Sequence, residues 1–84
     1  MNLFSENIMQ FEGKKVKVYS YHKIYGNQEL KIRKFHPICT PEKVGFKTNN
    51  QEIYIDFQDI IGLEYKDTSL KIIGKLMELL IELQ

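Results

Sequence analysis

Residues 44–57, VGFKTNNQEIYIDF, carry the strongest structural signal in this chain of 84 residues. Two runs rich in strand-forming residues, 44–48 and 52–57, flank the turn-favouring pair Asn49-Asn50. The pattern predicts a β-hairpin. Its alternation divides the side chains between two faces, because successive residues of a strand point to opposite sides. The inward set is expected to be Val44, Phe46, Ile53, Ile55 and Phe57. The outward set is Lys47, Tyr54 and Asp56.

A second hairpin is predicted on the N-terminal side of the first. Residues 15–21 alternate between an inward set containing Val16 and Val18 and an outward set containing Lys17 and Tyr19. Residues 30–35 repeat that alternation, and the glycine and asparagine within 25–28 favour a chain reversal between the two strands. Residues 36–41 contain two prolines, which lack a backbone donor, and this segment is predicted to be a connection. Residues 3–10 are predicted to form one or two helical turns capped by Ser5.

The C-terminal part of the chain is predicted to change from strand to helix. Residues 59–62 are expected to form a short 3₁₀ or tight turn that leads into a fifth short strand at 63–65. On a helix, residues 70–83 gather their charged residues into one stripe and leave an apolar arc of about 200 degrees, wider than the roughly 100 degrees of a surface helix. An alternative makes residues 70–73 a sixth strand and limits the helix to 75–84. The excess apolar surface is expected to form an oligomer contact through Leu76, Leu79, Leu80 and Leu83, or to pack under the N-terminal segment.

The fold predicted for residues 1–84 is therefore a single, mainly β domain. It consists of a small five-stranded SH3/Sm-like barrel over residues 11–66 and an apolar C-terminal helix over 69–84. A chain of this length buries only about 60–65% of its unfolded surface, so self-association would add to a small core.

The layout of residues 11–65 resembles that of small Sm-like and SH3-like barrels. The block at 55–64, IDFQDIIGLE, is similar to the ending of YolD-like proteins, where a strand and a short turn lead into the closing strand. The resemblance implies an oligomer-prone barrel of a kind that often binds RNA, DNA or other proteins. The nucleotide-contacting signatures of true Sm proteins are absent from this sequence, and the C-terminal helix is not a general feature of them.

Charge is sorted along the chain although the formal net charge is only +1. Residues 14–47 hold nine basic residues and two acids, a net charge of +7, whereas residues 48–84 hold three lysines and seven acids, a net charge of −4. This sorting predicts an anionic partner or contact with a second copy of the chain. An outward face with lysines and tyrosines suits phosphates and stacked bases. The expected ligand-binding residues are Lys15, Lys17, Tyr19, Tyr21, Lys31, Arg33 and Lys47.

Two other interpretations of that basic face remain open. In the first, the face is an ordinary solvated sheet surface, and its lysines protect the hairpin edge from aggregation. Alternatively, acidic residues of a neighbouring protomer, such as Asp56 and Glu64, would meet it.

Catalysis and metal binding are not expected. His36 and Cys39 have an H-x-x-C spacing, but a structural zinc site needs four ligands and the chain has one cysteine and two histidines. Cys39 also lacks a recognisable signature of a catalytic nucleophile, and the chain contains no glycine-rich phosphate loop. We therefore expect a protein that binds and does not catalyse, with no metal and no cofactor.

The preferred partner is nucleic acid or a nucleotide, together with further copies of the chain. The alternative is a small protein-binding adaptor or inhibitor, of phage or mobile-element origin, that docks through its C-terminal helix or its charged faces. The single cysteine and the lack of a signal sequence predict a cytoplasmic location. No apolar run approaches the ~20 residues that a membrane span needs, so no membrane partner is expected.

Overall fold

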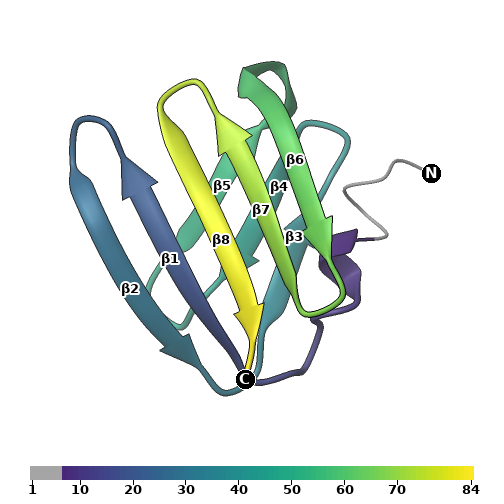
Figure 1. Cartoon of the computed structure of the whole chain (residues 1–84). Helices are drawn as coiled ribbons and strands as arrows, with labels where there is room; N and C mark the ends of the chain where they lie inside the picture. The colour runs from purple at the N-terminus through teal and green to yellow at the C-terminus, as the bar shows by residue number, and fades with distance from the viewer. Residues whose placement is uncertain (1–6) are drawn as a thin grey trace.

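The computed structural model of the protein describes residues 7–84, which fold into two antiparallel β-sheets that face each other (Figure 1). The first two strands form a hairpin, the next three form a meander, and the last three form a second meander. A 3₁₀ turn, η1 (Phe57–Asp59), joins the two meanders. The strands are β1 (Val16–His22), β2 (Gly26–Ile32), β3 (His36–Cys39), β4 (Lys43–Lys47), β5 (Glu52–Asp56), β6 (Ile60–Lys66), β7 (Ser69–Gly74) and β8 (Met77–Leu83).

The first and last strands lie side by side at the centre of the larger sheet. That sheet has the order β2-β1-β8-β7-β6, so the last strand pairs with the first, and Val16 lies opposite both Ile32 of β2 and Leu83 of β8. The smaller sheet has the order β3-β4-β5. Because β2 and β6 are both edge strands of an open sheet, the barrel predicted from the sequence is wrong: the larger sheet does not close on itself. The domain is a two-layer structure rich in strands.

The core lies between the two sheets and follows the alternation of each strand. Val16 and Val18 of β1, Leu70 and Ile72 of β7, and Leu79 and Ile81 of β8 are fully buried from the larger sheet. The smaller sheet contributes Val44, Phe46, Ile53 and Ile55, as the sequence predicted. Phe35, in the link between β2 and β3, packs against Phe46 with their ring centroids 5.5 Å apart. Both sheets therefore bury one face against the same apolar layer.

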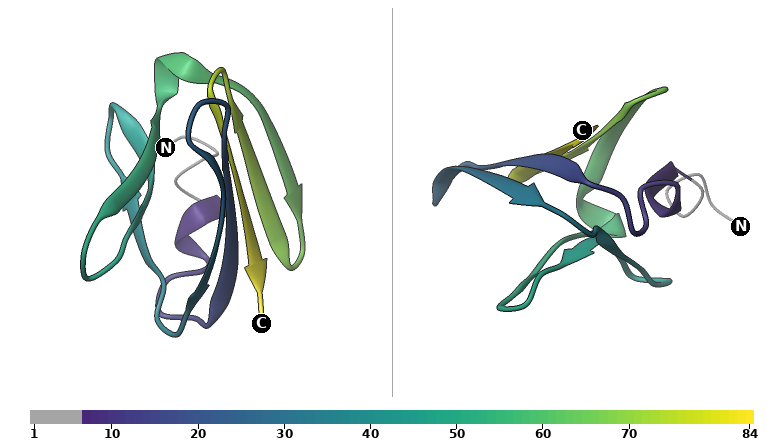
Figure 2. Two further views of the ribbon diagram at one scale, coloured as in Figure 1. Left: turned by 90° about the vertical axis from the view of Figure 1, so that its left-hand side faces the viewer. Right: turned by 90° about the horizontal axis from the view of Figure 1, so that it is seen from below.

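The N-terminal segment closes one open side of the two layers. Residues 7–9 form a helical turn, from which Ile8 and Phe11 insert fully into the core. Tyr65 on the edge strand β6 donates a hydrogen bond of 2.8 Å to Oε1 of Gln10. Viewed along the layers, the turn lies at the side opposite β2 (Figure 2). This agrees with the helical turn predicted within residues 3–10, whereas the predicted cap Ser5 lies outside the described residues.

The predicted C-terminal helix is absent, and residues 69–83 form the β7–β8 hairpin instead. Inward positions Leu70, Ile72, Leu79 and Ile81 alternate with outward ones such as Lys71 and Glu78, which is the period of a strand. The turn between them lies at Lys75 and Leu76. The alternative prediction, a strand over 70–73 followed by a helix over 75–84, is correct for the strand and wrong for the helix. Because this segment is not helical, a partner cannot dock on a C-terminal helix as the alternative function required.

Two smaller predictions also need correction. Residues 36–39, predicted to be a connection, form β3. Pro37 is compatible with this strand because β3 is the outer strand of its sheet and needs no donor on its free side. The turn of the first hairpin lies at residues 23–25, a few residues before its predicted position, and β2 begins at Gly26, whose φ of 88 degrees requires glycine. Within residues 7–84, no helix has the length and apolar character that crossing a membrane requires.

The turn between β1 and β2 depends on a histidine ring. Nδ1 of His22 accepts hydrogen bonds from the backbone N–H groups of Ile24 (3.1 Å) and Tyr25 (3.3 Å). We expect His22→Ala to lower the free energy of unfolding by about 1 kcal/mol, because both turn amides lose their acceptor. His22→Asn should retain most of the stability, since an asparagine oxygen accepts from the same amides in an Asx-turn. Urea denaturation of the two variants tests this, and an equal loss in both would assign the effect to packing of the ring.

Candidate nucleic-acid interface

A cleft of about 720 Å³ opens between the two sheets on the side of β2. The inner side and C-terminal end of β2 form one wall, and the end of β4 with the following turn forms the other. We call this site the basic cleft. It is lined by Gln28, Leu30, Lys31, Ile32, Arg33, Lys34, His36, Lys47, Thr48, Asn49, Asn50 and Gln51.

The lining of the basic cleft is cationic on both walls. Lys31, Arg33 and Lys34 come from β2 and the link after it, and Lys47 comes from the end of β4. His36 begins β3 between them. No aspartate or glutamate contributes to this lining. Positively charged side chains bordering one concave surface create a positive potential that attracts anions.

The link between β2 and β3 fixes where two of these cations project. At this point the chain leaves the larger sheet and enters the smaller one, and Phe35 anchors the passage in the core. The backbone N–H of Phe35 donates to the carbonyl of Lys14 (3.0 Å), and the N–H of Gly13 donates to the carbonyl of Phe35 (2.8 Å). Arg33 and Lys34 precede this anchor and are exposed. The hydrogen bonds and the burial of Phe35 fix the backbone of the link, and this places Arg33 and Lys34 at the basic cleft.

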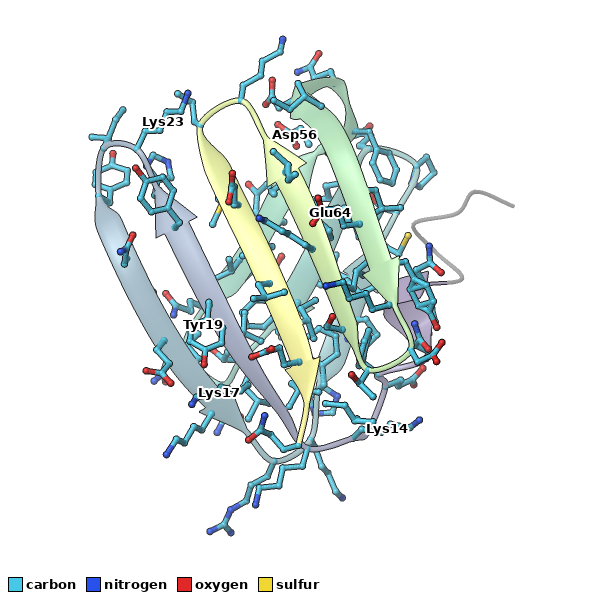
Figure 3. All side chains as sticks on the ribbon, in the orientation of Figure 1. Lys14, Lys17, Tyr19, Lys23, Asp56 and Glu64 are labelled. Carbon is cyan, nitrogen blue, oxygen red and sulfur yellow. The ribbon has the colours of Figure 1, made fainter. Side chains whose placement is uncertain are left out.

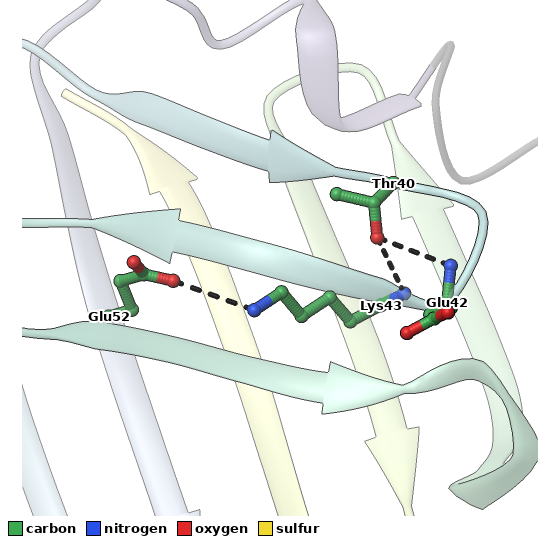
Figure 4. Close-up of polar contacts among 4 residues, drawn as sticks. All are labelled: Thr40, Glu42, Lys43 and Glu52. Atoms are coloured by element: carbon green, nitrogen blue, oxygen red, sulfur yellow. Dashed lines mark hydrogen bonds and ion pairs between the residues drawn. The ribbon is translucent and has the colours of Figure 1, made fainter.

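Lys47 keeps its charge available because its cross-strand neighbour is engaged elsewhere. Glu52 lies directly opposite Lys47 in the β4–β5 ladder. Its carboxylate instead pairs with Nζ of Lys43 at 3.6 Å (Figure 4). Lys43 also lies over the ring of Tyr54. The turn before β4 supports this arrangement, since Oγ1 of Thr40 accepts from the N–H groups of Glu42 and Lys43. Among residues 7–84, no carboxylate lies within ion-pair distance of the four cations of the basic cleft.

The basic cleft continues along β2 into a second hollow of about 170 Å³. The two hollows share Gln28 and Gln51, and the second one extends to His22 and Tyr25 at the far end of the hairpin. The rings of His22 and Tyr25 lie against each other at an angle of 40 degrees with their centroids 4.6 Å apart, and Tyr25 is 84% exposed. Half-buried Leu30 and Ile32 provide apolar surface in the basic cleft. We call the basic cleft and this second hollow together the trough. The trough is cationic at the end near Arg33 and Lys34 and aromatic at the end near Tyr25.

The seven ligand-binding residues expected from the sequence divide between two faces. Lys31, Arg33 and Lys47 line the basic cleft, although the ladder with β1 places the side chain of Lys31 on the same outer face as Lys17. Lys17, Tyr19 and Tyr21 lie on the outer face of the larger sheet, where Figure 3 shows Lys17 and Tyr19, and Lys15 directly precedes β1. The structure therefore brings three of the seven together and adds Lys34 and His36.

The outer face of the larger sheet has mixed charge. β8 lies beside β1 and places Glu82 opposite Lys17 and Glu78 opposite Tyr21. Lys17 itself forms an ion pair of 2.8 Å with Glu29 of β2. This hydrogen bond raises the pKa of Lys17 and lowers the pKa of Glu29, so both groups stay charged at neutral pH and remain paired. Acidic neighbours thus offset the lysines that the sequence alone places on one cationic face.

The leucines expected to form an oligomer contact do not share a surface. Leu79 is fully buried in the core, and Leu80 is half-buried on the opposite face of the same strand. Leu76 is exposed in the β7–β8 turn, and Leu83 is 37% exposed at the end of β8. A contact that uses all four is incompatible with this hairpin.

His36 and Cys39 point to opposite faces of β3, because they are three residues apart on a strand. The H-x-x-C spacing therefore does not bring the two side chains together. Residues 7–84 contain no group of three or more histidine, cysteine or acidic side chains arranged to hold a metal ion.

Lys34 and His36 were not among the site residues predicted from the sequence. Both lie within KIRKFH, residues 31–36, so their proximity to Arg33 along the chain was a usable signal. No protein family, curated protein or solved structure matches this chain. The chemistry of the basic cleft is therefore the basis for assigning a function: its cations suit phosphates, and its amides can donate and accept hydrogen bonds with bases.

Proposed function

We propose that this protein binds single-stranded nucleic acid in the basic cleft and does not catalyse a reaction on it. The observation that carries the proposal is that Lys31, Arg33, Lys34 and Lys47 all border one cleft with no acid in its lining, Lys31 from the outer face of β2. Like charges brought together in this way repel each other, and an anionic ligand relieves that repulsion. Phosphates contacted by lysine and arginine supply most of the affinity of such sites.

The shape of the trough favours a strand over a separate nucleotide. The basic cleft is continuous with the hollow that leads to Tyr25, so an extended ligand follows β2 from cations to an exposed ring. Tyrosine rings stack on bases of any sequence, whereas cations contact the backbone. The amides of Gln28, Asn49, Asn50 and Gln51 line the same path. Proteins that bind single strands of any sequence combine a cationic groove for the backbone with aromatic rings for the bases, and the trough offers both.

The first test is the salt dependence of binding to a fluorescently labelled single-stranded oligonucleotide of about 16 nucleotides. Four phosphate contacts predict a slope of log affinity against log salt of about −2.8, because each contact on a single strand contributes about 0.7. Affinity measured by fluorescence anisotropy should fall about fiftyfold between 50 and 200 mM salt. Affinity independent of salt, or no binding at low salt, would contradict the proposal.

The double variant Arg33→Glu/Lys34→Glu should bind at least about tenfold more weakly, with a salt slope smaller by about 1.4. The control is Lys66→Glu/Lys75→Glu, which reverses two exposed lysines at the end of the far edge strand β6 and in the β7–β8 turn. It makes the same change in net charge and should bind much more tightly than the cleft variant. Equal losses would mean that net charge, and not the cleft, governs binding. Equally tight binding of a mononucleotide would remove the extended-strand part of the proposal.

A further inference from the structure

β2 is the most regular free edge of the larger sheet. It has seven residues, and its ladder pairs it only with β1. The other edge strand of that sheet, β6, has a register shift between Ile60 and Gly62, and the edge strand β3 contains Pro37. Irregularities and prolines are devices that keep sheet edges from pairing with other chains. β2 contains no proline and has an unbroken register with β1, so its free edge is competent to pair.

The charges on the outer face of β2 are incompletely paired within one chain. Lys31 lies directly opposite Lys17 in the β1–β2 ladder, and like charges in this position destabilise a sheet. The nearby Glu29 forms its ion pair of 2.8 Å with Lys17. No described carboxylate lies within ion-pair distance of Lys31. The edge therefore carries a cation that lacks a direct cross-strand acid.

We propose that the free edge of β2 pairs antiparallel with β2 of a second copy, about a two-fold axis at Leu30. This register places Glu29 of each copy opposite Lys31 of the other, so that two ion pairs form on the outer face. Leu30 meets Leu30, and Gln28 meets Ile32, on the inner face. Registers centred on Glu29 or on Lys31 would place identical charges opposite each other. Charge complementarity thus selects one register.

The dimer joins two five-stranded sheets into one continuous sheet of ten strands. The two-fold axis is perpendicular to the joined sheet, so the two three-stranded sheets, and with them the two basic clefts, lie on the same side. The pairing does not depend on nucleic acid, and its test is therefore carried out without any. A protein that does not dimerise would contradict only the dimer proposal. A protein that does not bind oligonucleotide would contradict only the binding proposal.

Light scattering during size-exclusion chromatography tests the proposal on the whole chain. The wild-type protein should approach twice the chain mass of 10.0 kDa as its concentration rises. Glu29→Lys and Lys31→Glu place like charges across the axis, and each should weaken self-association at least about tenfold. An equimolar mixture of these two variants restores both ion pairs and should form a heterodimer. The double variant Glu29→Lys/Lys31→Glu should form a homodimer again.

Lys75→Glu is the matched control and should dimerise as the wild-type protein does, since it changes the charge equally outside β2. Amide hydrogen exchange supplies a second readout if Glu29→Lys, which removes the partner of Lys17, fails to fold. In the wild-type protein, exchange at alternate β2 amides should slow as concentration rises, and in Lys31→Glu it should not. A wild-type monomer at about 1 mM, or a mixture of single variants that stays monomeric, would overturn the proposal.

Discussion

Leu79→Glu is expected to unfold the protein, whereas Leu80→Glu is expected to leave it folded. Leu79 is fully buried between the two sheets, and Leu80 is half-buried on the outer face, opposite Tyr19 of β1 and Lys71 of β7. A carboxylate at position 79 would lose its hydration with no cation to pair with, at a cost of several kcal/mol. That cost is a large part of the roughly 4–12 kcal/mol that stabilises a domain of this length.

The measurement is thermal and urea unfolding followed by circular dichroism. Leu79→Glu should show no cooperative transition, and the milder variant Leu79→Ala should lose about 2–5 kcal/mol because it leaves a cavity. Leu80→Glu should lose about 1 kcal/mol or less, since its carboxylate lies opposite Lys71. A helix over residues 70–83 would place both leucines within one apolar arc and would give similar losses. Similar losses would therefore contradict the β8 assignment.

Apolar residues on the outer face explain why the C-terminal hairpin resembles a helix in sequence. Ile73 and Leu80 are apolar residues on the outer, half-buried face of β7 and β8, and they interrupt an otherwise clean alternation. With them, residues 70–83 have an apolar arc of about 200 degrees when placed on a helix, so the pattern fits a largely buried helix as well as a strand. Gly74 would be unfavourable inside such a helix. In the structure it ends β7 and precedes the turn at Lys75 and Leu76.

Local alternation was sufficient to predict the β1–β2 and β4–β5 hairpins and their inward residues. In both, a turn sequence joins two strands that are adjacent along the chain, so pairing and register are local properties. The pairing of β8 with β1 joins opposite ends of the chain, and no local pattern specifies it. The barrel prediction failed for this reason, because β8 takes the position beside β1.

The candidate site was predicted in part for the same physical reason. The basic segment could be recognised from composition, and Lys31, Arg33 and Lys47 do meet at the basic cleft. The sequence alone could not show that β8 would bring Glu78 and Glu82 beside Lys17 and Tyr21. Nor could it show that the link after β2 would cross between sheets and face the end of β4. Placement of the cations depends on long-range topology and not on strand alternation.

Among the Gly→Ala substitutions, Gly45→Ala is expected to cause the largest loss in the free energy of unfolding. A β-carbon at this position would lie 2.8 Å from Cβ of Tyr54 and would overlap the backbone carbonyl of Ile53. Gly45 and Tyr54 lie opposite each other in the β4–β5 ladder, so relief requires the two strands to separate. We expect a loss of about 3 kcal/mol, the upper part of the range for overpacked sites.

Gly62→Ala is the matched control, because the nearest atoms to a β-carbon there all belong to the side chain of Ile73, at ordinary contact distances of 3.4 Å and more. This variant should be unchanged or more stable by about 0.4–1 kcal/mol, since alanine restricts the unfolded chain more than glycine does. The two variants are compared by urea unfolding. A Gly45→Ala protein as stable as the wild type would show that β4 and β5 do not approach each other as described. Because the turn after β4 forms one wall of the basic cleft, the loss at Gly45 should also weaken oligonucleotide binding, whereas Gly62→Ala should not.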